Sequence, residues 1–218
     1  MKKGKFIVIE GIDGSGKTTQ IDMLKDMYGN YPDNPESKFS FHREPTDTDL
    51  GIFIRQLLSK DYYYRPSDGE LAALFLADRV HHINDPKWGI KQYLDKGINV
   101  ICDRYYYSNF AYQGQGELED WVFKMNMDYP GLIKPDLCIF LDVTPMVALN
   151  RIMGSRDDSE IAIFENLQNL TDIRNKYTKV LQKLNDDGIC VIDANKKSSY
   201  QIHNEIKQVI SHIIKEEL

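Results

Sequence analysis

Residues 11–18, GIDGSGKT, match the pattern G-x-x-x-x-G-K-[ST], which cradles the phosphates of a nucleoside triphosphate. Glycines permit a tight turn, and successive backbone N–H groups at a helix N-terminus then face the phosphate anions. In such a loop Lys17 neutralises the β- and γ-phosphate oxygens, and the hydroxyl of Thr18 ligates Mg²⁺. The ATP-binding residues predicted here are Gly11, Asp13, Gly14, Ser15, Gly16, Lys17, Thr18 and Thr19.

A second polar stretch, ICDRYYYSNFAYQGQG at 101–116, begins at the end of an apolar strand. It places Asp103 and Arg104 at the carboxyl edge of the expected sheet, where ligands bind in open α/β folds. A guanine-specific N-K-x-D tetrad is absent from the sequence, and no strand ends in the Asp-Glu pair of a motor ATPase. A second anionic substrate beside the triphosphate explains Arg104, which indicates phosphoryl transfer to a small molecule. Asp103 joins Thr18 as a predicted metal ligand.

Two further stretches carry side chains suited to a nucleotide substrate. Residues 42–56 contain Arg43, Glu44 and Arg55, and arginine can clamp phosphate oxygens through two parallel hydrogen bonds. In LFLADR at 74–79, Phe75 and Arg79 lie four residues apart on one helical face. Taken alone, a Phe at position 75 on an apolar helix face is more typical of a core residue than of a ligand contact, and an Arg at position 79 is more typical of a surface ion pair. At least one residue of Tyr105–Tyr107 must pack, since three consecutive rings cannot all face a ligand.

The elements that hold these residues alternate between strands and helices, which predicts a parallel sheet covered on both faces. The fold class is α/β, with five parallel strands, helices on both faces and a short lid. Expected strands are 5–10, 38–42, 99–103, 136–142 and 188–194. Expected helices are 17–28, 50–60, 70–83 (capped by Ser67 and Glu70), 87–96, from 145 to about 153, about 160–186, and the C-terminal segment.

The 218 residues suit one domain, 1–218, with a mobile lid at about 154–162, where the sequence is small, polar and charged. A net charge of −6 argues against a duplex nucleic-acid partner. Three cysteines, Cys102, Cys138 and Cys190, lie in apolar runs without metal or disulfide spacing, as expected of reduced core residues in a cytoplasmic protein. We expect no signal peptide, no membrane span and no membrane partner.

The chain resembles the thymidylate kinases, nucleoside-monophosphate kinases with a P-loop kinase fold that make dTDP from dTMP. The resemblance rests on FIVIEGIDGSGKTTQ, REPT, LFLADR, DRYYYSNFAYQG, KPDLCIFLDVTP and IDA, which occur in the order and spacing of that family over about residues 5–195. The stretch DRY-x-x-S-x-x-AYQG after a P-loop is specific, whereas REP and DVTP alone are weak signals.

The resemblance implies MgATP as the phosphoryl donor, dTMP as the acceptor and a homodimer that uses helices such as 70–83. It implies that Arg55 and Arg104 hold the dTMP phosphate, that Asp13 accepts the sugar 3′-hydroxyl, and that Tyr112 lies under the deoxyribose. Phe75 then stacks on thymine, Arg79 binds its O4 edge, and Asn109 and Gln113 read its polar edge. Glu44 belongs to the same substrate site, and Arg151 packs on adenine near Asp193 and Ala194.

The chain departs from the family in its catalytic arginine. Enzymes of this family carry that arginine either in the P-loop or in the lid, and Gly14-Ser15 leaves no arginine in the P-loop. The lid pattern of acidic-Arg-x-Glu is best matched by AIFEN at 162–166, which has Ile163 in place of the arginine and keeps Glu165. Arg156 is the predicted replacement, with Lys17 and Arg104 as the other catalytic cations. The alternative is a solvated Arg156 paired with Asp157 or Asp158.

Two other functions fit parts of this pattern. A deoxynucleoside kinase also combines a P-loop, an Asp-Arg pair and a lid, and it needs a general base, for which Glu10 is the candidate. A nucleotide-binding regulator with weak catalysis is the second alternative, supported by the missing lid arginine.

Overall fold

The computed structural model describes residues 2–59, 61–155, 167–184 and 188–215. Its sheet contains β1 (Phe6–Glu10), β2 (Phe39–Arg43), β3 (Asn99–Asp103), β4 (Leu137–Asp142) and β5 (Ile189–Asp193), in the order β2-β3-β1-β4-β5. All neighbouring strands are parallel. The fold class predicted from the alternation of strands and helices is therefore confirmed.

The centre of the sheet forms the core of the protein. β1 pairs with both β3 and β4, and its residues Phe6, Ile7, Val8 and Ile9 have no exposed surface. A continuous apolar run, rather than an alternating one, is what a strand covered on both faces requires. The core thus fixes the point at which the P-loop leaves β1.

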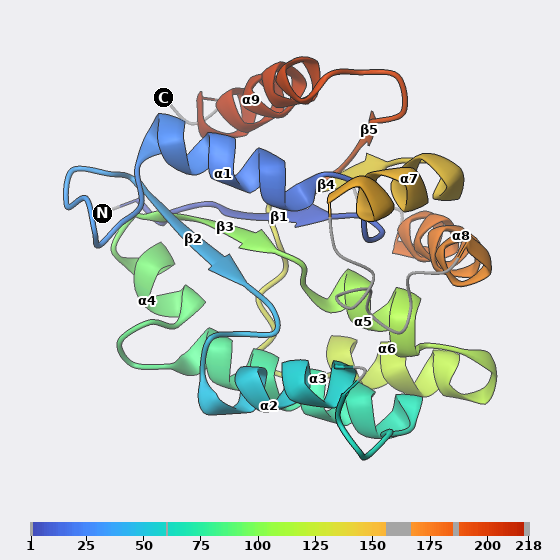
Figure 1. Cartoon of the computed structure of the whole chain (residues 1–218). Helices are drawn as coiled ribbons and strands as arrows, with labels where there is room; N and C mark the ends of the chain where they lie inside the picture. Colours follow the sequence, from blue (N-terminus) through green and yellow to red (C-terminus); the bar gives the residue numbers. More distant parts are fainter. Residues whose placement is uncertain (1, 60, 156–166, 185–187, 216–218) are drawn as a thin grey trace.

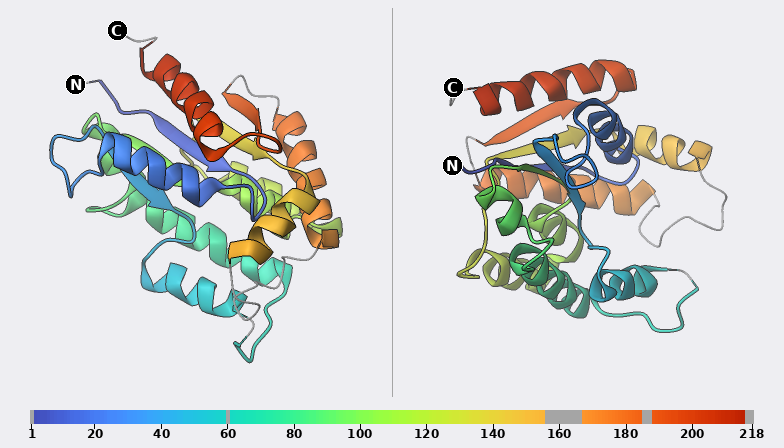
Figure 2. Two further views of the ribbon diagram at one scale, coloured as in Figure 1. Left: turned by 45° about the horizontal axis from the view of Figure 1, so that its top comes forward. Right: turned by 90° about the vertical axis from the view of Figure 1, so that its left-hand side faces the viewer.

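Helices cover both faces of this sheet (Figures 1 and 2). On one side lie α1 (Lys17–Tyr28) and α9 (Ser199–Lys215), which contact each other. The opposite side holds α3 (Asp68–Asn84), α4 (Ile90–Asp95), α5 (Tyr106–Gln113), α6 (Glu119–Met127) and α8 (Leu167–Leu184). Helix α2 (Asp49–Leu58) contacts α3, and α7 (Pro145–Ser155) contacts α8. The predicted capping box of Ser67 and Glu70 begins α3.

Two helices, α5 and α6, were not predicted from the sequence, which had indicated only a polar stretch at 101–116. Helix α5 buries Tyr106, Tyr107 and Phe110 in the core. Polar residues occupy much of its remaining surface, so the sequence has no clean apolar stripe to reveal the helix. Packing, the role expected for Tyr106 and Tyr107, is confirmed.

Residues 156–162 of the predicted lid lie outside the described residues, as do Arg156, Ile163 and Glu165. In the part of the chain that the structure describes, no helix has the length and apolar character needed to cross a membrane.

Candidate active site

The carboxyl ends of three adjacent strands bring the candidate site together. Backbone hydrogen bonds join the Glu44 nitrogen to the Asp103 oxygen at 3.0 Å and the Arg104 nitrogen to the Ile9 oxygen at 3.1 Å. Because β2, β3 and β1 are parallel neighbours, the residues that follow or end them must lie side by side. Glu44, Arg104 and Glu10, although they are far apart in the sequence, therefore share one edge of the sheet.

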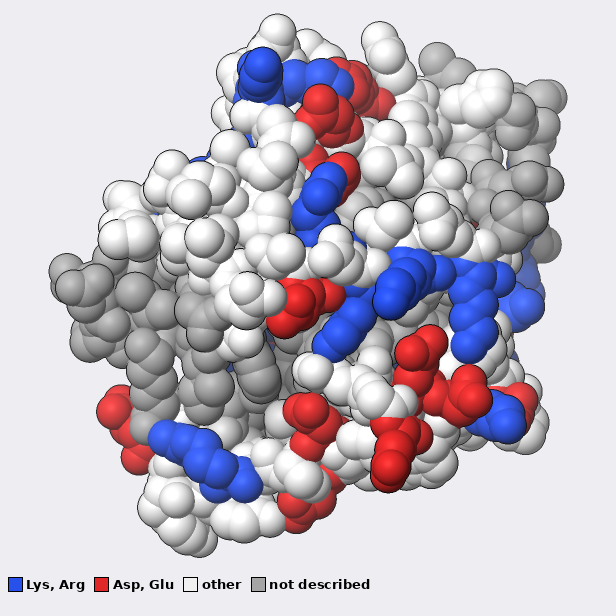
Figure 3. Space-filling model, turned by 90° about the vertical axis from the view of Figure 1, so that its right-hand side faces the viewer, with Lys and Arg blue, Asp and Glu red and all other residues white. Residues whose placement is uncertain are grey.

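Figure 3 looks onto the side of the molecule toward which the β1 arrow points in Figure 1. Lys and Arg side chains form a run across the middle of this side, and Asp and Glu side chains lie next to them. This side of the molecule therefore carries charges of both signs, although the whole chain carries a net charge of −6.

The P-loop has the backbone that its glycines predict. Gly14 and Gly16 have positive φ values of 76° and 101°, and a Cβ at Gly14 would lie 2.4 Å from the carbonyl oxygen of Ala148. A residue with a side chain is strained at such φ values, and at Gly14 it would also collide with α7. Gly16 is the N-cap residue of α1, so the free backbone N–H groups of the first helical turn lie next to the P-loop.

Lys17 lies inside the P-loop with 6% of its surface exposed. Its Nζ donates to the carbonyl oxygens of Gly11 at 3.0 Å and Ile12 at 3.1 Å. Burial, followed by the nearby charge of Arg104, lowers the pKa of Lys17 from 10.5 to about 8. An anion in the loop favours the charged ammonium, so phosphate binding and the protonation of Lys17 reinforce each other. Thr18 and Thr19 are exposed in the first turn of α1.

Arg104 joins the P-loop to the second predicted half of the site. Its NH2 forms an ion pair with the carboxylate of Asp13, and its NH1 donates to the Gly11 carbonyl oxygen at 3.3 Å and to the Ser108 hydroxyl at 3.1 Å. The guanidinium carbon lies 5.1 Å from the centre of the Tyr112 ring. The backbone φ of Arg104 is 68°, an unusual value for a residue other than glycine, and such strain is concentrated at functional sites.

Asp13 connects the P-loop to Tyr112 as well. The Tyr112 hydroxyl donates to Asp13 Oδ2 at 3.0 Å, while Asp13 Oδ1 accepts from Arg104. Burial raises the pKa of the Tyr112 phenol, so this hydroxyl keeps its proton and acts as a donor. The structure thus brings together Arg104, Asp13 and Tyr112, three of the four residues for which the family resemblance implied contacts with the sugar and phosphate of dTMP.

Glu10 is completely buried beneath Arg104. It accepts hydrogen bonds from the Tyr105 backbone nitrogen at 2.7 Å, the Ser108 hydroxyl at 2.8 Å and the Tyr177 hydroxyl at 2.8 Å. A general base must reach the proton that it removes, and a carboxylate with no exposed surface and this set of donors does not. The role of Glu10 as the base of a deoxynucleoside kinase is therefore not supported.

Tyr177, from α8, is a residue of the site that sequence reasoning missed. Its hydroxyl contacts Glu10 and also lies 2.7 Å from the Ser108 hydroxyl and 3.4 Å from Arg104 NH1. Helix α8 has buried residues at Leu170, Ile173, Tyr177 and Leu181, and the sequence shows this periodicity as an ordinary amphipathic helix. The spacing of these four residues along the helix does not distinguish Tyr177, whose hydroxyl contacts the buried carboxylate of Glu10, from the residues that only pack.

Arg79 and Glu44 form a buried ion pair, with 1% and 2% of their side chains exposed. Arg79 NH2 lies 2.7 Å from Glu44 Oε2, and Arg79 Nε donates to the same oxygen at 2.9 Å. The alternative of a surface ion pair for Arg79 is therefore wrong. Arg79 also donates to Asn126 Oδ1 and lies over the ring of Tyr105, with 5.0 Å between the guanidinium carbon and the ring centre.

Asn109 and Gln113 lie on α5 and are connected to Arg79 through Asn126. Asn126 Nδ2 donates to Asn109 Oδ1 at 2.8 Å, and Asn109 Nδ2 donates to Gln113 Oε1 at 3.1 Å. All three amides are buried, with exposed fractions of 0% for Asn126, 2% for Asn109 and 3% for Gln113. The predicted base-reading residues thus belong to one hydrogen-bonded group. Asn126, on helix α6, belongs to the same group, although the sequence predicted neither this helix nor a role for this residue.

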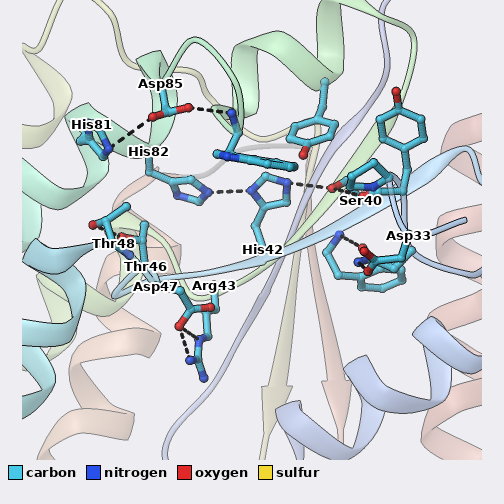
Figure 4. A pocket seen from close by; sticks show the side chains of 16 residues that line it. Asp33, Ser40, His42, Arg43, Thr46, Asp47, Thr48, His81, His82 and Asp85 are labelled. Carbon is cyan, nitrogen blue, oxygen red and sulfur yellow. Dashed lines mark hydrogen bonds and ion pairs between the residues drawn. The ribbon is translucent and has the colours of Figure 1, made fainter. Parts of the chain in front are cut away.

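Two histidines that contact each other, His42 and His82 (Figure 4), support the other oxygen of Glu44. His82 Nδ1 lies 3.0 Å from Glu44 Oε1, and His82 Nε2 lies 2.8 Å from His42 Nδ1. His42 lines a pocket of about 410 Å³ beside β2, which Figure 4 shows from close by. Burial, followed by the neighbouring His82, lowers the pKa of His42 to about 3, so its imidazole is neutral near pH 7.

The remaining predicted residues on the acceptor side lie in α2 and α3. Phe75 is half-buried on the same helix as Arg79. Arg55 donates to the Pro45 carbonyl oxygen at 2.7 Å and to Asp47 Oδ1 at 3.1 Å, which places it beside the segment that follows Glu44. Arg43, at the end of β2, forms an exposed ion pair with Asp47.

Arg151, from α7, connects the P-loop to the segment after β5. Its guanidinium donates to the carbonyl oxygens of Gly14 at 3.4 Å, Ser15 at 3.3 Å and Ala194 at 2.7 Å. The family resemblance implied that Arg151 lies near Asp193 and Ala194, and the structure brings Arg151 and Ala194 together. Ser15 itself is completely buried.

Asp103, one of the two predicted ligands of Mg²⁺, has a carboxylate oxygen whose surroundings suit such an ion. Asp103 Oδ1 is buried and has no hydrogen-bond partner in the described part of the chain, and such an orphaned carboxylate oxygen suits a metal or a metal-bound water. Within residues 2–59, 61–155, 167–184 and 188–215, no group of three or more His, Cys, Asp or Glu side chains could hold a metal by itself. Mg²⁺ commonly binds through one or two protein oxygens together with substrate phosphates.

Comparisons with known proteins agree with this geometry. The family model for thymidylate kinase matches residues 9–206. The chain is 36% identical over 212 residues to a probable thymidylate kinase of Methanococcus maripaludis, with 94% of each chain covered. It is 38% identical over 208 residues to a thymidylate kinase of Carboxydothermus hydrogenoformans, which covers 94% of this chain and 96% of that protein.

A solved structure gives the same result. The thymidylate kinase of Candida albicans superposes with a TM-score of 0.77 at 26% identity, covering 96% of this chain and 92% of that one. The relatives match over almost their whole length, and the match spans the P-loop, Arg104 and the amides of α5. The chain therefore belongs to the thymidylate kinase family.

Proposed function

We propose that this protein phosphorylates dTMP to dTDP, with MgATP as the phosphoryl donor. The observation that carries the proposal is the position of Arg104, which contacts the P-loop at Gly11 and Asp13 and also the ring of Tyr112. A cation at this junction lies between a bound triphosphate and a second substrate. Family membership supplies the identity of that substrate.

The acceptor nucleotide lies along α5 and α3 in this proposal. Arg104 and Arg55 hold its phosphate, Asp13 accepts the 3′-hydroxyl, and Tyr112 packs under the deoxyribose. Phe75 stacks on the base, Arg79 donates to O4, and Asn109 and Gln113 bind the remaining polar edge. Glu44 supports this set through its ion pair with Arg79.

The ATP side is formed by the P-loop and Arg151. The backbone N–H groups of 11–18 and the ammonium of Lys17 bind the phosphates, and Arg151 packs on adenine next to Ala194. Thr18 and Asp103 are the residues that would hold Mg²⁺. When bound, this ion neutralises charge that develops on the phosphate oxygens.

The reaction needs no covalent intermediate with the protein, because the phosphate oxygen of dTMP attacks the γ-phosphorus of ATP in line. The protein positions two polyanions and stabilises charge on the group in transfer. Lys17 does this from the P-loop side. Arg104 does it from the dTMP side, after its guanidinium exchanges the carboxylate of Asp13 for the substrate phosphate.

Three finer features remain proposals from the sequence. Arg156 supplies the catalytic cation of the lid at about 154–162, and it lies outside the described residues. The protein forms a homodimer through helices such as α3, where Ala73 and Ala77 are exposed and Leu74 and Leu76 are half-buried. It acts in the cytoplasm.

A panel of substrates tests the proposed function. Purified protein is incubated with MgATP and one acceptor at a time, dTMP, dUMP, dCMP, dGMP or thymidine, and ADP release is followed. We expect the highest kcat/KM with dTMP. Faster turnover of thymidine than of dTMP would identify a deoxynucleoside kinase. Nucleotide binding without turnover of any acceptor would identify a regulator.

A further inference from the structure

Asn126 occupies the junction of a buried relay of polar side chains that begins at Arg79 and ends at Gln113. It accepts a hydrogen bond from Arg79 NH1 through Oδ1, and its Nδ2 donates to the Val122 carbonyl oxygen at 2.9 Å and to Asn109 Oδ1 at 2.8 Å. Asn126 has no exposed surface. No motif in the sequence pointed to this residue.

The orientation of the Asn126 amide is fixed by two groups whose polarity cannot change. A guanidinium only donates hydrogen bonds, so the Asn126 atom that faces Arg79 must be the oxygen. A backbone carbonyl oxygen only accepts, so the atom that faces Val122 must be the nitrogen. Both constraints select the same orientation, and an inverted amide would place like groups against both neighbours.

The orientation of the Asn126 amide also determines the orientations of the Asn109 and Gln113 amides on α5. Since Asn126 presents an N–H to Asn109, the Asn109 atom that receives it must be Oδ1. The Asn109 nitrogen then faces Gln113, which must present Oε1 to it. The donor-only character of Arg79 therefore determines the direction of three buried amides in succession.

We propose that Asn126 is a positioning residue that sets the preference of this protein for a pyrimidine with a keto group at C4 over one with an amino group. The proposal rests on the function proposed above, in which Arg79, Asn109 and Gln113 bind the base. Thymine offers an oxygen acceptor at C4 and an N–H at N3, whereas cytosine offers an amino donor and an acceptor nitrogen. The two bases require opposite polarities from the protein.

Because the donors and acceptors from Arg79 to Gln113 are fixed in one orientation, these side chains cannot rearrange to bind cytosine, which needs the opposite donors and acceptors. Arg79 already presents donors, and it cannot change them. Asn109 and Gln113 could in principle invert, but an inverted Asn109 would turn its nitrogen toward the nitrogen of Asn126. Asn126 contacts Arg79 and Asn109, both of which are proposed to bind the base, and in the contacts above it touches none of the predicted phosphate-binding residues. It therefore acts on the choice of base through these two side chains.

The variant Asn126→Ala tests this proposal. It leaves space in which a water can donate or accept in either direction, so the orientation of Asn109 is no longer imposed. We expect the ratio of kcat/KM for dTMP to kcat/KM for dCMP to fall by about tenfold or more, the scale of one lost polar discrimination. The change should lie mainly in KM, and calorimetric Kd values for dTMP and dCMP should move in the same direction.

Two further variants make the result unambiguous. Asn126→Ser, whose hydroxyl also donates or accepts, replaces Asn126→Ala if the latter does not fold. Asn84→Ala, an exposed asparagine at the end of α3, is the matched control and should keep the wild-type ratio. If the wild type phosphorylates dTMP and the folded Asn126 variants keep its ratio within about twofold, the proposed role of Asn126 is overturned. If the wild type does not act on dTMP or bind it, the proposed function fails first, and the role of Asn126 fails with it.

Discussion

The Arg79 guanidinium lies 2.7 Å from Glu44 Oε2, and almost no surface of either side chain is exposed. This pair joins α3 to the segment that follows β2, two parts of the chain that are separated by α2. Taking two charges out of water is costly, so such a pair is tolerated only when both partners are present and further hydrogen bonds complete them. His82 supplies one for Glu44, and Asn126 supplies one for Arg79.

Replacing Glu44 by Gln should therefore destabilise the protein. The change removes the negative charge and leaves the Arg79 guanidinium buried without its counterion, at a cost of about 3–5 kcal/mol in the free energy of unfolding. Urea denaturation followed by circular dichroism measures the loss. The control is Asp47→Asn, because Asp47 pairs with Arg43 and Arg55 at the surface, where about 0–1 kcal/mol is expected. Equal losses in the two variants would contradict the argument.

Replacing Arg104 by Ala should lower kcat/KM for dTMP by about 10²-fold or more, as for the loss of a major electrostatic group at a reacting centre. Steady-state kinetics of ADP release provide the measurement. Lys91→Ala, which removes an exposed cation on α4, should leave kcat/KM unchanged. Near-normal turnover in Arg104→Ala would remove Arg104 from the proposed mechanism.

Lys17 makes ATP use sensitive to pH. Its pKa in the free protein is about 8, so the ammonium loses its proton as the pH rises above that value. The kcat/KM for MgATP, which reports on the free enzyme, should fall above pH 8, whereas kcat should persist to higher pH because bound phosphates favour the charged form. Profiles of both parameters between about pH 6.5 and pH 10 test this. A kcat/KM that stays constant across that range would refute the assignment.

The same pKa shift has a consequence for stability. Because the pKa of Lys17 is lower in the folded protein than its ordinary value of 10.5, the unfolded chain binds more protons between about pH 8 and pH 10.5. The contribution of Lys17 to the free energy of unfolding should therefore rise with pH across this window, and it is least favourable below pH 8. Lys17→Met should lose this pH-dependent increment, which urea titrations of both proteins at several pH values would measure.

Asp103 should affect the requirement for magnesium. Asp103→Asn removes a charged oxygen ligand, so the Mg²⁺ concentration that gives half-maximal activity at fixed ATP should rise by several-fold, on the order of tenfold at most, since most ligands come from phosphate and water. The experiment is a Mg²⁺ titration of the initial rate for wild type and variant. Identical titration midpoints would exclude Asp103 as a ligand, direct or through water.

Arg156 is tested by truncation of its side chain. If it supplies the missing lid arginine, Arg156→Ala should lower kcat strongly, by about 10²-fold, because the charge that it neutralises develops in the transition state. The KM values for ATP and dTMP should change much less. An unchanged kcat would favour the alternative of a solvated arginine and leave Lys17 and Arg104 as the catalytic cations.

The sequence was sufficient for the parts of this protein that depend on local pattern. The alternation of apolar runs with amphipathic segments predicted five parallel strands and most helices. A strand buried on both faces appears in the sequence as a continuous apolar run, and a helix appears as apolar residues three or four positions apart. The P-loop was predicted together with its conformation, because Gly14 and Gly16 adopt backbone angles that other residues disfavour. Arg104 at the end of a strand was singled out for the same local reason.

Tertiary structure decided what each of these residues contacts. Tyr177 and Asn126 reach the site from α8 and α6, and both look like ordinary helical residues in the sequence because contacts across the fold leave no periodic signal. The sequence also left the roles of Arg79 and Glu10 open. Arg79 could have formed an ion pair at the surface or a contact with the base, and Glu10 could have been a general base or a buried hydrogen-bond acceptor. Only the packing of the helices against the sheet excluded water from these charges and thereby fixed their partners.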